Sequence, residues 1–457
     1  MNIIIIGAGI AGLAAANELA KGGHAVTVLE AAGVAGGLAS GFKDERWEWP
    51  LERFYHHIFT TDRAIIDLAH EIGADDLLMF QSPVSGQWWN GQAYALDGVV
   101  PILRFPGLPF ADRLRFGMVG AYLKFVTNDW RTLEQTTAAR WTERWAGKNV
   151  YQTIWRPMLE GKFGPYVDQV NMAWLWARLK TRSFKLGYFR GGFQAFVDAL
   201  LAHVQQQGVQ ITLGTPVREL EPLGDGRWRV FADGLVPIEA DAVLVTGSPG
   251  LLSKLAPQLP ADYLGKLREL KSMGAVVMTL ALTEPLTGGI YWINMLKREF
   301  PFLSLVEHTN FISRVHYGGD HLVYAGDYLE PSHEYFRMSD AELLERFIPA
   351  LQMVNPQFER SWVRRVWVHR EPYAQPIVEV DHARNVPPLR TPLPGLFWAS
   401  MSQVYPWDRG TNFAVEIGQR VAGEIQHAEP SAVSYQPSDT HTSKLSAVSK
   451  TQRQADS

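Results

Sequence analysis

The sequence predicts an α/β fold built around a parallel sheet, and three observations near the amino terminus support this prediction. The apolar run NIIII at residues 2–6 indicates a short buried strand. It is followed at once by the glycine pattern GAGIAG at residues 7–12 and by an alanine-rich helical segment. A second apolar strand, residues 25–29, ends at Glu30. This strand–turn–helix–strand order is typical of a Rossmann-like nucleotide-binding unit.

Each glycine of this motif, and the glutamate that follows it, is required for a geometric reason. Gly7 permits the tight turn out of the strand, Gly9 lets the backbone approach a pyrophosphate, and Gly12 lets the helix pack closely on the sheet. The amino end of the helix offers free N–H groups and a positive dipole to phosphates. Glu30 is placed to accept hydrogen bonds from ribose hydroxyls. We therefore expect these four residues to bind a dinucleotide.

A second pair of glycines, Gly36-Gly37, follows Glu30 closely and indicates a second close approach of the backbone to the cofactor. With this pair the sequence resembles the flavin-dependent amine oxidase superfamily, which includes protoporphyrinogen oxidases and phytoene-type desaturases. The resemblance covers about residues 1–427 and implies FAD as the cofactor, with the glycine pair along its pyrophosphate and ribityl chain. Val34 and Leu38 replace two arginines that are common in the family. NAD is the competing cofactor.

Two later segments resemble the rest of that FAD-binding fold. Residues 209–249 contain a strand, a hairpin and another sheet strand, and the resemblance places the backbone of Val217 against the adenine. Residues 395–401 are expected to form one more strand before the carboxyl-terminal helix. Met401 stands where most members carry an acidic residue or asparagine. The resemblance implies that the amino end of the helix faces the flavin ring through Gly410, Thr411 and Asn412.

The pattern along the chain predicts two interleaved domains, a Rossmann-like FAD-binding domain and an α+β substrate-binding domain. The FAD-binding domain is expected from residues 1–55, 188–253 and 389–427. The substrate-binding domain is expected from residues 56–187, mainly helical, and 254–388, which supply strands. Residues 428–457 are rich in Ser, Thr, Gln and Ala, so we expect a disordered tail.

Composition narrows the function class. A net charge of −4 over 457 residues leaves no basic footprint for nucleic acid. The absence of cysteine excludes disulfides, thiol catalysis and a cysteinyl–flavin bond, so FAD is expected to be non-covalent. No metal site is expected. No apolar run approaches the roughly 18 residues of a membrane span, and no signal peptide is evident, so a cytoplasmic protein of undefined oligomeric state is expected.

His56, His57 and His308 are the candidate catalytic residues, because an imidazole titrates near neutral pH. Adjacent residues on a strand face opposite sides, so at most one of His56 and His57 would point into the site. A histidine hydrogen-bonded in the domain seam is the alternative interpretation. In the resembling amine oxidases a lysine stands near the flavin, and Met278 takes its place here, which counts against a strict amine oxidase.

Four further residues are candidates for substrate binding. Arg156 and Lys162 lie in a tryptophan-rich stretch and indicate either salt bridges or recognition of a substrate carboxylate or phosphate. Glu307 and Asn310 lie on a probable strand, where alternation would direct Glu307 to one face and His308 and Asn310 to the other. Eight tryptophans in residues 88–176 indicate either a packed core or an aromatic-lined cavity.

Residues 99–126 combine an apolar stretch with Arg113, Arg115 and Lys124. Two interpretations fit this pattern. The segment is a core helix whose charged residues face water, or it is a helix that lies in a membrane interface without spanning it. The second interpretation gives a protein in peripheral contact with the inner face of a membrane.

The resemblance implies an FAD-dependent oxidoreductase that abstracts hydride from a C–H, C–N or C–C bond of a bulky, largely apolar or ring-containing small molecule onto flavin N5. One alternative is a redox-neutral flavoenzyme resembling UDP-galactopyranose mutase, in which Arg364, Arg365 and Arg370 would bind a nucleotide sugar. The other is a non-catalytic flavin-binding protein, because several functional residues of the family are replaced. The sequence defines neither the substrate nor the electron acceptor.

Overall fold

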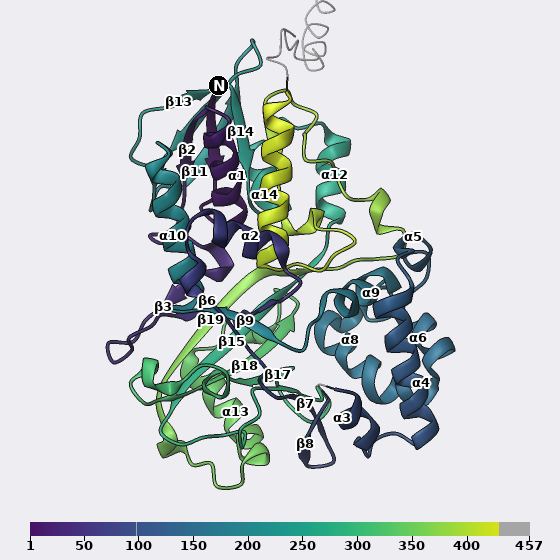
Figure 1. Cartoon of the computed structure of the whole chain (residues 1–457). Helices are drawn as coiled ribbons and strands as arrows, with labels where there is room; N and C mark the ends of the chain where they lie inside the picture. The colour runs from purple at the N-terminus through teal and green to yellow at the C-terminus, as the bar shows by residue number, and fades with distance from the viewer. Residues whose placement is uncertain (97, 429–457) are drawn as a thin grey trace, which may run out of the picture.

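The computed structural model describes residues 1–96 and 98–428, so residues 429–457 of the expected tail lie outside the described residues. Figure 1 shows three parts of the chain. A parallel sheet with its helices lies at the top, a mixed sheet lies below it, and a group of helices lies at one side of the mixed sheet.

The parallel sheet confirms the Rossmann-like α/β fold predicted from the amino-terminal motif. Its order is β10-β2-β1-β14-β20, and every neighbouring pair is parallel. Crossover connections of this kind require helices on the faces of the sheet. The strands are β1 (Asn2–Ile6), β2 (Ala25–Leu29), β10 (Gln210–Thr212), β14 (Ala242–Val245) and β20 (Leu396–Trp398).

The apolar residues of β1 alternate between two cores. Ile3 and Ile5 pack with α1 (Ile10–Lys21), α10 (Gly192–Gln206) and α14 (Thr411–Gln426). Ile4 and Ile6 pack on the other face with α11 (Pro249–Leu255) and α12 (Ala261–Glu269). The strand is therefore buried on both faces, which explains why it reads as a continuous apolar run. A small antiparallel sheet, which contains the hairpin expected from the sequence, joins the second core through β11 (Val217–Pro222), β12 (Trp228–Ala232) and β13 (Ile238–Ala240).

The mixed sheet lies between the parallel sheet and α13 (Asp340–Val354) (Figure 1). Its order is β19-β15-β18-β17-β16-β7-β8, antiparallel except where β16 meets β7. Residues 254–388, which were expected to supply strands, contribute five of its seven strands. Its strands are β7 (Ser85–Trp89), β8 (Gln92–Ala95), β15 (Ser272–Leu282), β16 (Trp292–Asn294), β17 (Ser304–Glu307), β18 (His321–Leu329) and β19 (Val363–Pro376).

The helical part packs around a core that contains Trp155, Phe163, Trp174 and Trp176. Of the eight tryptophans in residues 88–176, four are buried, three are partly buried and pack against this core, and Trp145 is exposed. No helix among the described residues is long and apolar enough to cross a membrane. The principal helices are α3 (Val99–Arg104), α4 (Phe110–Ala121), α5 (Trp130–Leu133), α6 (Ala138–Ala146), α7 (Lys148–Val150), α8 (Arg156–Phe163) and α9 (Met172–Thr181).

A three-stranded antiparallel sheet, β5-β9-β6, lies where the chain passes between the parallel-sheet part and the other two parts. Its strands are β5 (Ile58–Phe59), β6 (Leu78–Gln81) and β9 (Leu186–Phe189). The domain boundaries expected after residues 55 and 187 lie just before β5 and within β9, respectively. Helix α2 (Arg63–Glu71) follows β5 and packs on α14.

Candidate functional site

The loop between β1 and α1 has a surface made of backbone. Helix α1 begins after Gly9, and no side chain caps its first N–H groups. A Cβ atom on Gly12 would lie 2.0 Å from the Gly7 carbonyl oxygen, so the first turn of the helix can approach the loop only with glycine at this position. Free N–H groups at an uncapped helix start are suited to bind phosphate oxygens.

The second glycine pair lies directly beside this loop. The Gly36 N–H donates to the Ala8 carbonyl oxygen at 2.9 Å, and Gly9 and Gly36 form an isolated parallel bridge. Gly36 and Gly37 both have positive φ, +116° and +57°, which side chains disfavour. A Cβ atom on Gly37 would lie 3.4 Å from the Gly9 Cα. Two loops distant in sequence thus form one surface that is free of side chains and fits a pyrophosphate.

Glu30 connects the first loop to the chain that follows β2. Its Oε2 accepts a hydrogen bond from the Ala8 N–H at 2.7 Å, and its Oε1 accepts one from the Ala32 N–H at 2.8 Å. The Thr215 N–H donates to the Glu30 carbonyl oxygen at 2.7 Å. Because β11 begins two residues later at Val217, the residue expected at the adenine lies close to the residue expected at the ribose.

The carboxyl-terminal helix α14 begins where the three parts of the chain meet, a region that we call the seam. Gly410 precedes it without a side-chain cap, and Thr411 and Asn412 are buried. The Asn412 side chain is already engaged: Oδ1 accepts from the Ile65 N–H at 3.2 Å, and Nδ2 donates to Glu416 Oε1 at 2.9 Å. Asn412 therefore fixes α14 against α2, and its backbone rather than its side chain is available to a cofactor.

Tyr55, His56 and His57 follow β4 (Leu51–Glu52) and lie among aromatic rings. The Tyr55 ring meets the ring of Trp292 edge-on at 4.9 Å, and the His57 ring meets the same tryptophan at 5.8 Å. Burial lowers the pKa of His56 to about 4 and that of His57 to about 3. Both imidazoles are therefore neutral at pH 7, and the buried Nδ1 of His57 has no hydrogen-bond partner within residues 1–96 and 98–428. A neutral, unpartnered imidazole can orient a ligand, but these pKa values make it a weak proton acceptor at pH 7.

Lys162 and Arg156, which the sequence grouped together, diverge in the structure. Arg156 forms a surface ion pair with Glu160, one turn along α8. Lys162 is only 7% exposed, and its Nζ lies 4.8 Å from the ring centre of Tyr328. Burial and the neighbouring Arg178 lower the pKa of Lys162 well below its ordinary value.

The structure adds two residues to this group that the sequence reasoning did not select, Asp408 and Arg409. The Asp408 carboxylate accepts hydrogen bonds from Trp174 Nε1 at 2.9 Å and Arg178 Nη1 at 2.8 Å. Arg409 donates to the Tyr328 hydroxyl and, at 3.2 Å, to Gln375 Oε1. The position of both residues directly before Gly410 was the available signal, because the chain there leads into the helix expected at the flavin.

The alternation expected around Glu307 is wrong, because β17 ends at Glu307 and a 3₁₀ turn follows at His308–Asn310. Glu307 and Asn310 consequently converge on one residue. Thr287 donates its hydroxyl to Glu307 at 2.6 Å and accepts from Asn310 Nδ2 at 2.9 Å. Burial would raise the pKa of Glu307, but hydrogen bonds from His321, Thr287 and the Leu286 N–H outweigh it and lower the pKa. Both side chains thus hold the 286–290 loop.

His308 lies in the core between the two sheets. Its Nε2 and the Tyr317 hydroxyl are 2.9 Å apart, and its ring packs edge-on against those of Tyr188 and Tyr317. Burial lowers the pKa of His308 to about 3, so it is neutral. Its contacts are those of a core histidine. Met278 is also buried away from this seam, since it packs on α13.

Comparison with known proteins identifies the family. The profile described as flavin containing amine oxidoreductase matches residues 10–426. The chain belongs to this family. It is 24% identical over 394 residues to the 15-cis-phytoene desaturase of Narcissus pseudonarcissus, an alignment that covers 78% of this chain and 66% of the relative.

Solved structures of similar fold extend the comparison. A protein of Exiguobacterium sp. 255-15, provisionally described as a protoporphyrinogen oxidase, has a TM-score of 0.73 at 19% identity, covering 93% of this chain and 98% of its own. A reduced UDP-galactopyranose mutase has a TM-score of 0.71 at 15% identity, covering 94% of this chain and 96% of its own. The chain is therefore a flavin-dependent oxidoreductase of this family, with FAD as its cofactor. The paired glycine loops and the uncapped starts of α1 and α14 fit this cofactor.

Proposed function

We propose that this enzyme removes hydride from a C–H bond of a bulky, largely apolar small molecule. The observation that carries the proposal is the aromatic lining of the seam next to the start of α14. Tyr55, His57 and Trp292 pack edge to face there, beside Tyr324. FAD, when bound, supplies the hydride acceptor. The chain would hold the donor carbon in place and keep water away from it.

The protonation states of the histidines at the seam support these roles, in which FAD accepts hydride and the chain positions the substrate. Both imidazoles next to Tyr55 are neutral at pH 7, so they can accept or donate hydrogen bonds without carrying charge into the site. The Lys162 amine also lies at the seam, where burial and the neighbouring Arg178 lower its pKa. A strict amine oxidase remains disfavoured, because Met278, at the expected lysine position, packs on α13.

Anaerobic mixing tests the proposal. The purified yellow protein is mixed with candidate apolar substrates while the flavin absorption band near 450 nm, a general property of flavins, is followed. Oxidation of a substrate bleaches the band, and readmission of an electron acceptor restores it. Turnover only after prior chemical reduction of the flavin would instead support a redox-neutral enzyme.

The mutase alternative loses the residues that the sequence offered for it. Arg364 pairs with Asp320 at 2.6 Å and with Asp44 at 3.4 Å, and Arg365 pairs with Asp44 at 2.9 Å. Arg370 donates to the backbone carbonyl oxygens of Tyr335 and Met338. These arginines hold strands and loops together, so a nucleotide sugar would need other partners.

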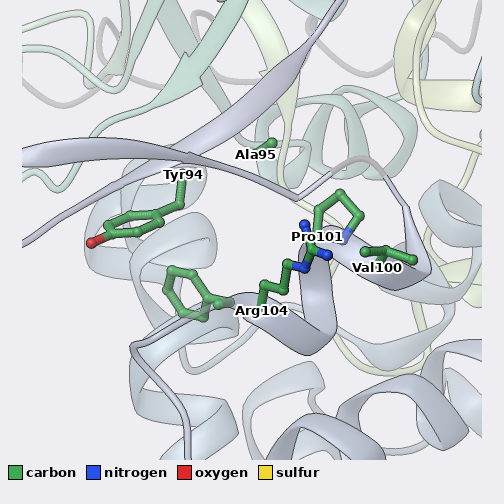
Figure 2. Close-up of a pocket in the computed structure, with 6 residues that line it drawn as sticks. Tyr94, Ala95, Val100, Pro101 and Arg104 are labelled. Carbon is green, nitrogen blue, oxygen red and sulfur yellow. The ribbon is translucent and has the colours of Figure 1, made fainter.

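We further propose that the helical part contacts a membrane surface. Residues 110–126, which contain α4 and the helical turn after it, are called the α4 segment here. Its exposed side is apolar, with large side chains at intervals of about one turn: Phe110, Leu114, Met118, Tyr122, Phe125 and Val126. A hollow of about 260 Å³ lies beside α3, and Tyr94, Val100, Pro101 and Arg104 line it (Figure 2). An apolar substrate that partitions into lipid would be supplied from such a surface.

A further inference from the structure

Among the described residues, cationic side chains at the seam outnumber the carboxylates that face them, and Lys162 is the buried one while the others are partly buried. We define the Lys162 cluster as Lys162, Arg178, Asp408 and Arg409. Three cationic side chains from α8, α9 and the segment before α14 thus share the single carboxylate of Asp408. Burial would raise the pKa of Asp408, but Lys162, Arg178 and Arg409 outweigh it and hold the carboxyl ionised. One carboxylate cannot neutralise three cations.

Lys162 is the member that lacks a partner. Among the described residues, no hydrogen bond or ion pair reaches its Nζ, which lies 4.8 Å from the ring centre of Tyr328 and 5.8 Å from that of Trp174. A buried ammonium without a carboxylate is costly, because the protein does not replace the water that it loses. Other cations near buried carboxylates of this fold are paired, as Lys297 is with Asp327 and Arg364 with Asp320. The unpaired amine is therefore a position at which a bound anion would offset this cost.

We propose that the Lys162 cluster binds an oxyanion carried by the substrate, a carboxylate or a phosphate on an otherwise apolar molecule. The proposal rests on the proposed oxidation and names the chemical class of its substrate. Arg409 contributes free guanidinium N–H groups beyond its bonds to Tyr328 and Gln375, and a guanidinium matches the geometry of an oxyanion. Arg178 is committed to Asp408 and fixes the cluster.

The phosphates of FAD do not account for the cluster. They are expected at the start of α1, beside Gly9 and Gly37. Gly418 of α14 packs on α1, where a Cβ atom would lie 2.4 Å from the Ala11 carbonyl oxygen. Gly418 is eight residues after Gly410, or about 12 Å along a helix axis. Arg409 thus lies at the far end of this span, by the aromatic residues Tyr55 and Tyr328.

The test is a titration of the FAD-loaded full chain with four matched probes: benzoate, phenyl phosphate, benzyl alcohol and benzylamine. Binding is measured by the change in the flavin absorption spectrum and by calorimetry. We expect benzoate or phenyl phosphate to bind at least about tenfold more tightly than the uncharged and cationic probes, as for other hydrogen bonds to charged groups. The tighter of the two anions distinguishes a carboxylate from a phosphate. Equal binding of benzyl alcohol and both anions would overturn the proposal.

The variant Lys162→Met removes the charge and keeps the length of the side chain. It should weaken binding of the preferred anion about tenfold to a hundredfold, with unchanged FAD content. Its melting temperature should equal or exceed that of the wild type, because the amine has no partner to lose. Lys148→Met, an exposed lysine on α7, is the matched control and should change nothing.

Unchanged anion affinity in Lys162→Met, or a lowered melting temperature, would assign the amine a structural role and overturn the proposal. Arg409→Gln provides a second variant with the same expected loss of anion binding. The result is separable from that of the proposed oxidation. If no substrate bleaches the flavin, the oxidation proposal fails, whereas the anion titration still decides whether the cluster binds an oxyanion.

Discussion

At the scale of single residues, the Glu30 carboxylate holds the two loops that it is expected to share with FAD. The motif predicted a ribose ligand, and the structure shows that both oxygens also accept backbone N–H groups, from Ala8 and Ala32. Each carboxylate oxygen has more than one acceptor site, so these bonds leave room for ribose hydroxyls. The residue thus orders the loop with the same atoms that are expected to bind the ribose.

Glu30→Ala should weaken FAD binding by about 1.5–3 kcal/mol, the typical contribution of a hydrogen bond to a charged group. Turnover at saturating FAD should stay near that of the wild type, because the ribose is remote from the reacting carbon. Fluorescence titration of the FAD-free protein measures the first effect, and the reconstituted enzyme the second. Glu45→Ala, at an exposed position, serves as the control. A large loss of turnover with full FAD occupancy would assign Glu30 a different role.

Glu52 is a buried carboxyl that the sequence did not single out. It accepts hydrogen bonds from the Tyr188 hydroxyl at 2.7 Å and the Phe193 N–H at 2.7 Å. Burial raises its pKa to about 7, although these hydrogen bonds act in the opposite direction. The folded state therefore keeps a proton on Glu52 that the unfolded chain, with an ordinary glutamate pKa of about 4.3, releases earlier.

This raised pKa predicts a pH-dependent stability. The contribution of protonated Glu52 is complete below about pH 4 and is lost as the pH rises through about 7. Glu52→Gln stays neutral, so its free energy of unfolding should rise relative to the wild type by up to about 3 kcal/mol between these pH values. Urea unfolding at several pH values measures the difference, with Glu45→Gln as the control. A difference that does not depend on pH would contradict the raised pKa.

At the scale of elements, the α4 segment reverses the arrangement expected from its sequence. Its basic side chains are partly buried and donate to backbone carbonyl oxygens. Arg113 donates to the carbonyl oxygens of Leu103 and Leu108, Arg115 donates to those of Arg144 and Trp145, and Lys124 donates to that of Leu179. The two arginines thus bind backbone near the carboxyl ends of the neighbouring helices α3 and α6, and the apolar side of the segment is left exposed.

This arrangement predicts the outcome of a liposome-binding experiment. The wild type should sediment with liposomes through its apolar face, so binding should persist in high salt, which screens exposed charges within about 10 Å at 0.1 M. Leu114→Asp with Met118→Asp should abolish sedimentation and keep the FAD spectrum. Val236→Asp with Val315→Asp changes two exposed apolar residues elsewhere and is the control. A wild type that stays in the supernatant would exclude the contact.

Local elements were predictable where the cause is local. The strand, glycine loop and helix of residues 2–21 follow from a buried apolar run and from the close approach of Gly12 to Gly7. Strands expected within residues 254–388 were also found, among them β18 (His321–Leu329). The end of β17 at Glu307 was not predictable by alternation, because Thr287, from a distant loop, holds that carboxylate.

At the scale of the whole molecule, the cofactor site and the Lys162 cluster differ in how far sequence reasoning reaches. The glycine loops carry a pattern whose spacing encodes their geometry. Lys162, Arg178 and Arg409 carry none, since tertiary packing alone brings α8, α9 and the segment before α14 together. The burial that makes Lys162 chemically distinct is likewise a property of the folded chain.

FAD should hold these parts together as a non-covalent ligand. The chain has no cysteine to form a thioether, and His56 and His57 would be the histidines available for a covalent bond. Precipitation in acid should therefore leave a colourless pellet and a yellow supernatant, whereas a yellow pellet would contradict the prediction.

Because FAD binds the folded state, its removal should lower the melting temperature. An excess of 100-fold over the dissociation constant should restore about 2.7 kcal/mol of stability. Full restoration on adding FAD, and none on adding NAD, would also separate the two cofactors that the glycine pattern alone left open.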